Sequence, residues 1–156
     1  QCSRILFGAS KMESQYSNTQ SNWNSMIYEL SQEFYFEAAH TLDREIDAIG
    51  SKRIHGHTYY AEITLVGVPD RKTGMLTDLG YVRREIQRVR DILDHRFLDE
   101  IPSIGPATLE NLCAFLFKEL KSGMPELIRV SVGRRASGDR CTLSLDKLTA
   151  AQSSTD

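Results

Sequence analysis

The segment HGHTYYAEITLV, residues 55–66, decides the fold because its side chains alternate in character along the chain. One set of alternate positions consists of His55, His57, Tyr59, Ala61, Ile63 and Leu65. In a β-strand, alternate positions project from the same face of the sheet. The pattern therefore predicts a strand with one face that begins with two imidazole side chains and continues with Tyr and apolar residues.

A second alternating segment, LSQEFYFEAAH (residues 30–40), precedes the first and ends in another histidine. Its shared face consists of Leu30, Gln32, Phe34, Phe36, Ala38 and His40. The polar connection between the two segments, 41–54, has 14 residues, which are enough for an antiparallel return. We therefore expect His40 at the end of one strand to lie beside His55 and His57 at the start of the next.

Three imidazoles without a thiolate or carboxylate are typical of a catalytic zinc site, which keeps an open coordination position. A structural zinc site would normally have a fourth protein ligand. An HxH pair by itself is more often two polar residues that face water at the end of a strand. With a third histidine in place, the pattern predicts zinc, or another divalent metal that favours imidazole, bound by His40, His55 and His57.

Two helices and two further strands are predicted after this hairpin. Apolar residues three or four apart indicate a helix after Asp78 and another after Thr108, both good N-caps. Short strands are expected at Leu127–Val132 and Cys141–Leu145. The order ββααββ predicts an α+β fold, a four-stranded antiparallel sheet with both helices on one face. The uncovered face and open edges of such a sheet favour assembly into a homo-oligomer.

Composition and length describe an ordinary globular protein of 156 residues, 40% hydrophobic and 26% charged. A formal net charge of -2 gives no electrostatic basis for binding nucleic acid or an anionic membrane. No apolar run approaches the ~20 residues that span a bilayer. Three scattered cysteines without a CxxC motif form no disulfide framework, which indicates a reducing, cytoplasmic environment.

The predicted domain spans residues 26–146 and contains no internal repeat. Residues 1–25 are rich in Ser, Asn and Gln and lack periodicity, so we expect a disordered or extraneous extension there. Residues 147–156 are expected to form a flexible tail.

His95 lies in the segment LDHRFLD, at the end of the first predicted helix. Asp94 or Asp99 could orient its imidazole and raise its basicity, as in general acid–base pairs. Adjacent residues on one helix do not face each other, so Asp94 and His95 would pair only where the helix has ended. The alternative is a helix C-terminal histidine favoured by the macrodipole, and the sequence leaves both interpretations open.

Two further segments contain candidate ligand-binding residues. Thr108 and Glu110 begin the second helix, where they either serve its N-terminus or hold a heterocycle with several N–H donors. The segment GRRASGDR contains Arg134, Arg135 and Arg140, which form either a solvated turn or a site for a phosphate or carboxylate group. Neither segment decides the function by itself.

In their order and spacing, the segments FYFEAAH, RIHGHTY, TGMLTDL, LDHRFLD and IPSIGPATLENL resemble the 6-pyruvoyl-tetrahydropterin synthase / 6-carboxytetrahydropterin synthase family. The resemblance covers about residues 30–145. It implies the tunnelling fold, in which trimers close their sheets into a barrel, stack as hexamers and form active sites between subunits. It also implies that His40, His55 and His57 bind zinc and that the substrate is a pterin, 7,8-dihydroneopterin triphosphate.

The same resemblance assigns roles to the other candidate residues. The Asp94–His95 pair would move protons, while Thr108 and Glu110 would grip the pterin. The implied enzyme is a zinc-dependent carbon–oxygen or carbon–carbon lyase that acts on the pterin side chain. Its reaction would be that of a 6-carboxytetrahydropterin synthase, on the route to queuosine, or that of a 6-pyruvoyl-tetrahydropterin synthase.

Two positions depart from the family pattern. Ser51 stands four residues before the HGH motif, where the family has its catalytic cysteine, and a serine hydroxyl ionises far less readily than a thiol. Arg134 stands where the family has a pterin-anchoring glutamate, and a guanidinium cannot accept hydrogen bonds from ring N–H groups. The alternative function is therefore a catalytically altered, zinc-binding homologue that binds a different pterin-like ligand or has a role in assembly.

Overall fold

The computed structural model describes residues 26–46 and 48–145. Their elements, in order, are β1 (Tyr28–His40), α2 (Ala48–Ser51), β2 (His55–Gly67), α3 (Leu79–Leu93), β3 (Arg96–Phe97), a 3-10 helix (Leu98–Glu100), α4 (Leu109–Lys121), β4 (Leu127–Arg134) and β5 (Asp139–Ser144). The predictions for residues 1–25 and 147–156 fall outside the described residues. No helix among the described residues is long and apolar enough to cross a membrane.

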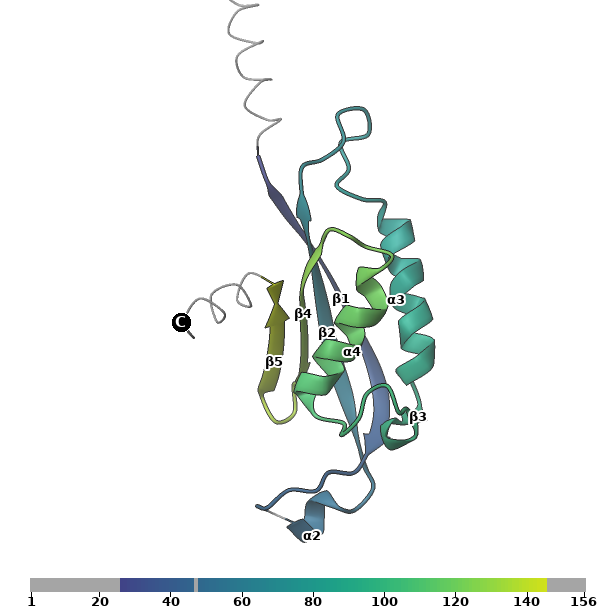
Figure 1. Ribbon diagram of the computed structural model, residues 1–156, viewed down its shortest axis with the longest axis vertical. Coiled ribbons are helices and arrows are strands. Elements are labelled where there is room, and N and C mark those ends of the chain that lie inside the picture. The colour runs from purple at the N-terminus through teal and green to yellow at the C-terminus, as the bar shows by residue number, and fades with distance from the viewer. Residues whose placement is uncertain (1–25, 47, 146–156) are drawn as a thin grey trace, which may run out of the picture.

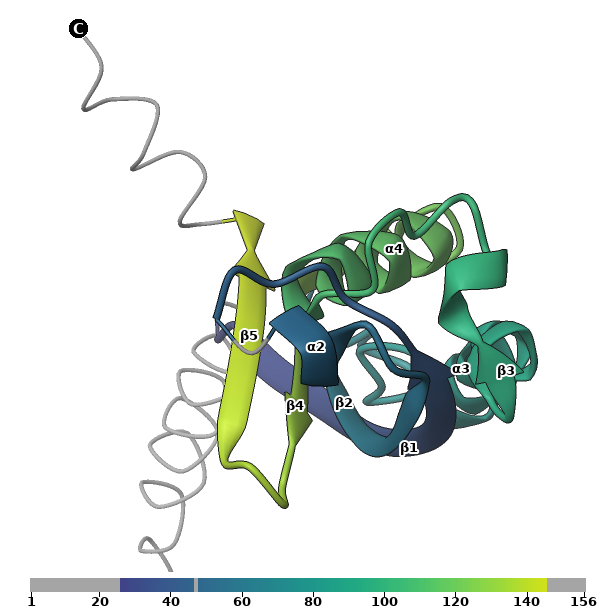
Figure 2. The same ribbon diagram turned by 90° about the horizontal axis from the view of Figure 1, so that it is seen from below.

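All five strands form one sheet in the order β3-β1-β2-β4-β5, and α3 and α4 lie on one face of it (Figure 1, Figure 2). The four long strands are antiparallel, so the predicted α+β fold is confirmed. The fifth strand, β3, is an addition that pairs in parallel with β1 at Ala38 and Ala39. A strand of two residues is too short to leave an alternating pattern in the sequence.

The hairpin of β1 and β2 carries the site. The two strands pair along their whole length and end with His40 opposite His55. The same register places Phe36 opposite Tyr59, and their rings stack with centroids 5.1 Å apart. Because alternation continues without a break to the end of the hairpin, the histidines extend the face that builds the core.

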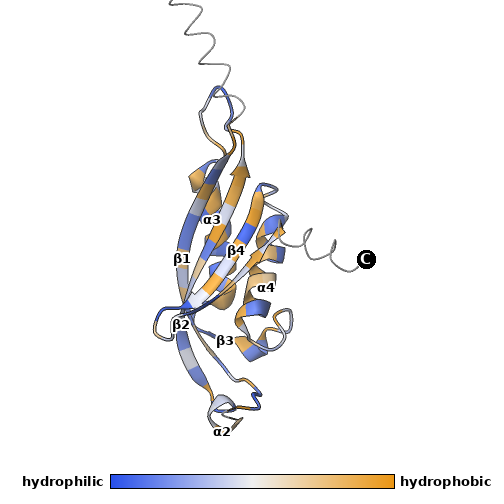
Figure 3. Cartoon of the chain, turned by 90° about the vertical axis from the view of Figure 1, so that its left-hand side faces the viewer, coloured by the Kyte–Doolittle hydropathy of each residue, from blue (hydrophilic) through white to orange (hydrophobic). Residues whose placement is uncertain are grey.

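The core lies between this face and the two helices. Its fully buried side chains include Phe36, Tyr59, Ile63, Leu65, Val89, Leu93, Leu112, Leu116, Leu120, Val130 and Val132. α3 packs on β1, while α4 packs on β4 and β5. Hydrophilic and hydrophobic residues alternate along the strands in Figure 3, because the other face of the sheet is open.

The ends of the helices position the remaining site residues. Asp78 caps α3 by accepting a hydrogen bond from the amide two residues on, at 2.7 Å. Thr108 caps α4, and its Oγ1 accepts a hydrogen bond from the Asn111 amide at 3.2 Å. α3 ends at Leu93, and Asp94 returns to extended backbone, so the chain can turn and run beside β1.

Candidate metal centre and adjoining cavity

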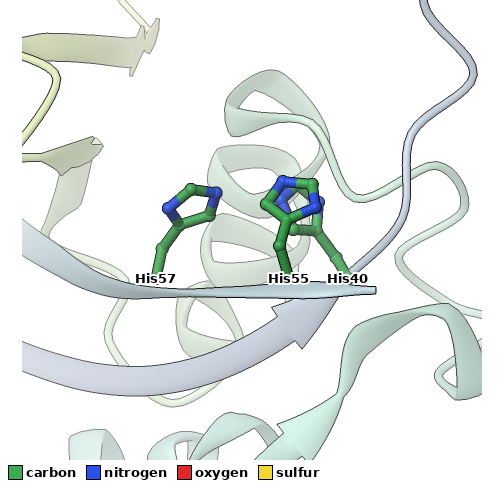
Figure 4. A group of neighbouring side chains, drawn as sticks. All are labelled: His40, His55 and His57. Atoms are coloured by element: carbon green, nitrogen blue, oxygen red, sulfur yellow. The ribbon is translucent and has the colours of Figure 1, made fainter. Parts of the chain in front are cut away.

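Three histidines meet where β1 ends and β2 begins. His40, His55 and His57 project from the same face of the sheet (Figure 4). The ring centroid of His40 lies 4.5 Å from that of His55 and 5.2 Å from that of His57. One ring nitrogen of each residue lies within 4.8 Å of the other two. The structure thus brings the three predicted metal ligands together, and we call them the histidine triad.

The surroundings of His40 and His57 favour neutral imidazoles. His40 is only 1% exposed, and burial, together with His55 and His57, lowers its pKa to about 4. Burial also lowers the pKa of His57, and the guanidinium of Arg134 lowers it further. Since a metal ion binds only the deprotonated ring nitrogen, these two residues are in a form able to ligate at neutral pH.

Hydrogen bonds at the ring nitrogens show that two members of the triad suit a metal. Both nitrogens of His40 are buried and have no hydrogen-bond partner within the described part of the chain. Nδ1 of His55 donates to the carbonyl oxygen of Arg53 at 2.8 Å, which leaves Nε2 free to ligate. Burying an unpaired polar group costs free energy, and a metal bond at His40 would offset that cost. The donor set fits a divalent ion that favours imidazole.

A cavity of about 510 Å³ has a volume typical of small-molecule sites. It adjoins the triad through two of its lining residues: Arg134 contacts His57, and the ring centroid of Tyr59 lies 5.7 Å from that of His57. Its lining includes Tyr59, Thr108, Glu110, Arg134, Asp139 and Cys141. Three residues that the sequence singled out as candidate ligand contacts, Thr108, Glu110 and Arg134, therefore face one space. They come from the start of α4 and the end of β4, which are neighbours because α4 packs on that strand.

Arg134 connects the cavity with the triad. Its Nε donates to the carboxylate of Asp139 at 3.3 Å, and Nη2 pairs with the other oxygen of the same carboxylate. Its Nη1 donates to Nε2 of His57 at 3.2 Å. The hydrogen bond from Arg134 lowers the pKa of Asp139 to about 2, so this carboxylate is ionised at neutral pH.

Sequence reasoning missed two residues of the cavity. Asp139 stands directly opposite Arg134 in the β4–β5 hairpin, and only the register of that hairpin would have indicated the pair. Tyr59 shares its strand face with His57, but strand alternation alone does not distinguish a cavity residue from a core residue. Its hydroxyl is buried without a hydrogen-bond partner among the described residues, and burial raises its pKa to about 12, so it remains a donor.

Asp94 and His95 form a pair at the edge of β1, and the His95 ring lies toward the face of the sheet opposite to the triad, near Glu37. Nδ1 of His95 lies 3.2 Å from the Asp94 carboxylate, because the helix has ended and His95 takes a left-handed φ of 56°. The backbone amide of Glu37 donates to Asp94 at 2.9 Å and lowers the pKa of that carboxyl. Nε2 of His95 lies 3.8 Å from the Glu37 carboxylate. Glu37 and His40 are three residues apart on β1, so their side chains leave opposite faces.

The structure gives Asp99 and Ser51 local partners. Asp99 does not orient His95; it accepts hydrogen bonds from the amide of Thr41, at 3.1 Å, and from its hydroxyl, which fixes the chain directly after β1. Ser51 lies in α2, inside a connection predicted to be all loop, and is 5% exposed. Its hydroxyl lies 3.4 Å from the carbonyl of Ala48 and 3.4 Å from the amide of Arg44.

Fold and site together define a class: an α+β domain whose central hairpin presents three histidines beside a ligand-sized cavity. The model of the 6-pyruvoyl tetrahydropterin synthase family matches residues 29–144. The chain therefore belongs to this family, as the sequence motifs indicate.

Known members of the family show how far the similarity extends. A putative 6-pyruvoyl tetrahydrobiopterin synthase of Caenorhabditis elegans is 38% identical over 73 residues, 45% of this chain and 52% of the relative. A 6-carboxy-5,6,7,8-tetrahydropterin synthase of Synechocystis is 29% identical over 106 residues, 64% of this chain and 81% of the relative. The chain spans about half the length of the Caenorhabditis elegans relative.

A solved structure gives the same result for the fold. The Caenorhabditis elegans 6-pyruvoyl tetrahydropterin synthase superposes with a TM-score of 0.68 at 28% identity, and the match covers 76% of this chain and 96% of that one. The enzyme of Plasmodium vivax, at 18% identity and a TM-score of 0.62, shares the fold.

Proposed function

We propose that the protein is a zinc-dependent lyase that acts on the side chain of 7,8-dihydroneopterin triphosphate. The observation that carries the proposal is the histidine triad beside a ligand-sized cavity. Family membership supports pterin chemistry, since the relatives are named as synthases of tetrahydropterins. Zinc held by His40, His55 and His57 would supply a Lewis acid that polarises a hydroxyl group of the ligand.

The cavity offers hydrogen-bonding groups of both kinds. The carboxylate of Glu110 can accept from N–H groups of a heterocycle. Thr108 already accepts from a backbone amide at 3.2 Å, so its hydroxyl hydrogen remains available as a donor. Arg134 adds further N–H donors at the edge nearest the triad. A ring with both a donor edge and an acceptor edge, such as a pterin, matches this arrangement.

Asp94 and His95 provide the acid–base chemistry of the proposal. An ionised Asp94 accepts from Nδ1–H of His95 and so leaves Nε2 as the nitrogen that exchanges protons. Within one chain this nitrogen lies on the face of the sheet opposite to the triad. We therefore propose a homo-oligomer, a trimer or hexamer, in which a second copy brings its Asp94–His95 pair to the triad.

The direct test is turnover. Purified protein loaded with zinc is incubated with 7,8-dihydroneopterin triphosphate, and the products are separated by chromatography. We expect 6-carboxytetrahydropterin or, as the alternative branch, 6-pyruvoyl-tetrahydropterin, and we expect His57→Ala to abolish either product. Zinc-loaded wild type that converts neither this compound nor dihydroneopterin contradicts the proposal.

The contact between Arg134 and His57 favours a second candidate function, a zinc-binding homologue that takes a different pterin-like ligand or serves in assembly. The variant Ser51→Cys separates the two candidates, because it restores the thiol that the family pattern has at this position. A large gain in pterin turnover would identify a weakened pterin lyase. Unchanged, negligible turnover would favour the second candidate.

A further inference from the structure

Arg134 uses the one lone pair that His57 can offer. A neutral imidazole has one N–H and one acceptor nitrogen, while a guanidinium has only donors. Because Nη1 of Arg134 lies 3.2 Å from Nε2 of His57, Nε2 must be the acceptor and Nδ1 must carry the hydrogen. The lone pair that a metal would require is therefore engaged by a cation.

Neither way of ligating through His57 is compatible with this contact. A metal at Nε2 would take the lone pair that now accepts from Arg134. A metal at Nδ1 would leave the hydrogen on Nε2, so that two donors would face each other. Repulsion between the guanidinium and a divalent cation acts in the same direction in both cases.

The other two members of the triad are arranged in the opposite way. His55 donates through Nδ1 to a backbone carbonyl, which leaves Nε2 available. His40 has no partner at either nitrogen among the described residues. Two of the three histidines are thus ready for a metal, and His57 is the member at which metal binding is opposed.

The guanidinium is held firmly where it stands. Two of its nitrogens bind the carboxylate of Asp139, and the hydroxyl of Ser137 binds that carboxylate in turn. The side chain of Arg134 is 19% exposed. Moving the guanidinium away from His57 therefore requires its contacts with Asp139 to rearrange. In this respect Arg134 differs from an arginine that is free in solvent.

We propose that Arg134 competes with the metal for His57, so that it weakens metal binding and leaves His57 when the metal binds. The inference rests on the proposed function for the identity of the metal, zinc, and makes no use of the reaction. Arg134, a residue of the cavity wall, would thus help to set the metal affinity of the triad.

The test compares zinc affinity, measured by competition with a chromophoric chelator, in wild type, Arg134→Met and Arg135→Met. Arg135 is a matched control, because its guanidinium lies 3.7 Å from the ring centroid of Tyr60 on the other face of the sheet. Both variants lose one positive charge. We expect Arg134→Met to bind zinc at least about tenfold more tightly, the scale on which groups bonded to metal-ligating histidines act.

Arg134→Ala is a second variant with the same expected direction, and thermal unfolding of the metal-free proteins shows which variants are folded. Equal zinc affinity in wild type and both Arg134 variants overturns the inference and leaves the proposed function standing. Equal tightening by Arg135→Met also overturns it, since the cause would then be general charge. Zinc binding by an Arg134 variant but not by wild type supports the inference. If none of the proteins binds zinc, both the inference and the proposed zinc-dependent function are contradicted.

Discussion

Histidines lie in opposite environments on the two sides of the β1–β2 hairpin. On the face covered by helices, His40 is 1% exposed and its pKa is lowered to about 4. On the open face, His95 is 75% exposed and lies between the carboxylates of Asp94 and Glu37. Burial keeps the first imidazole neutral, the form that a metal would require, while the second has water and carboxylates around it, which would support the proton transfer that we propose. The two histidines thus differ in burial and in partners because they lie on different sides of the sheet.

Replacement of His95 is expected to give the largest difference between the two faces, because turnover should fall while zinc content stays unchanged. His95→Gln is expected to lower turnover by about 10²- to 10⁴-fold, the usual contribution of a general acid–base group. The zinc content of His95→Gln should stay at the wild-type level, because His95 does not contact the triad. His57→Ala, in contrast, should lose both turnover and bound zinc. Elemental analysis of zinc per chain, next to the turnover assay, checks this. Loss of zinc in His95→Gln would break the division between the faces.

The free energy of unfolding should also depend on which face of the sheet a side chain lies on. Ile63 is 0% exposed in the core, so Ile63→Ala is expected to lower the free energy of unfolding by about 2–5 kcal/mol. Glu62, its neighbour on β2, points to the open face, and Glu62→Ala should change the same quantity by less than about 0.5 kcal/mol. Urea unfolding measures both. Comparable losses would mean that the open face is covered as well.

The pH dependence of stability should report His40 and His57. The folded-state pKa of His40, about 4, lies below the 6.5 of an unperturbed histidine, so between these values only the unfolded chain binds the proton. The metal-free protein should therefore gain stability as pH rises from 4 to 6.5, by at most about 1.4 kcal/mol per pH unit from this residue. Burial and Arg134 lower the pKa of His57, which adds in the same direction.

Urea unfolding in the presence of a chelator, repeated across this range, measures the slope. His40→Ala should show a shallower slope than wild type. Stability that falls as pH rises from 4 to 6.5 would contradict a neutral His40 and His57 in the folded protein.

Most of the fold could be predicted because one face of each long element is buried, which leaves a period of two in the strands and 3.6 in the helices. β3 and α2 escaped prediction because they are too short to show a period. β3 owes its place to tertiary contacts, such as the amide of His95 donating to the carbonyl of Glu37 at 2.6 Å.

The histidine triad could also be predicted, because its three members lie on the alternating faces of two long strands. Strand alternation and the length of the connection between the two strands were enough to predict that the three histidines lie close together. The partners Asp139 and Glu37 could not be predicted, because they depend on a hairpin register and on where the chain crosses beside β1. The bond between Arg134 and His57 joins residues 77 positions apart, and no local pattern encodes it.

We propose that one site is built from opposite faces of two copies, and mixing two inactive variants tests this arrangement most directly. His57→Ala and His95→Ala are each expected to be inactive, and the two chains are unfolded and refolded together in equal amounts. If the site lies between copies, random pairing gives about one quarter of wild-type turnover in the refolded mixture as a whole. Mixed oligomers that form but remain inactive would contradict the claim.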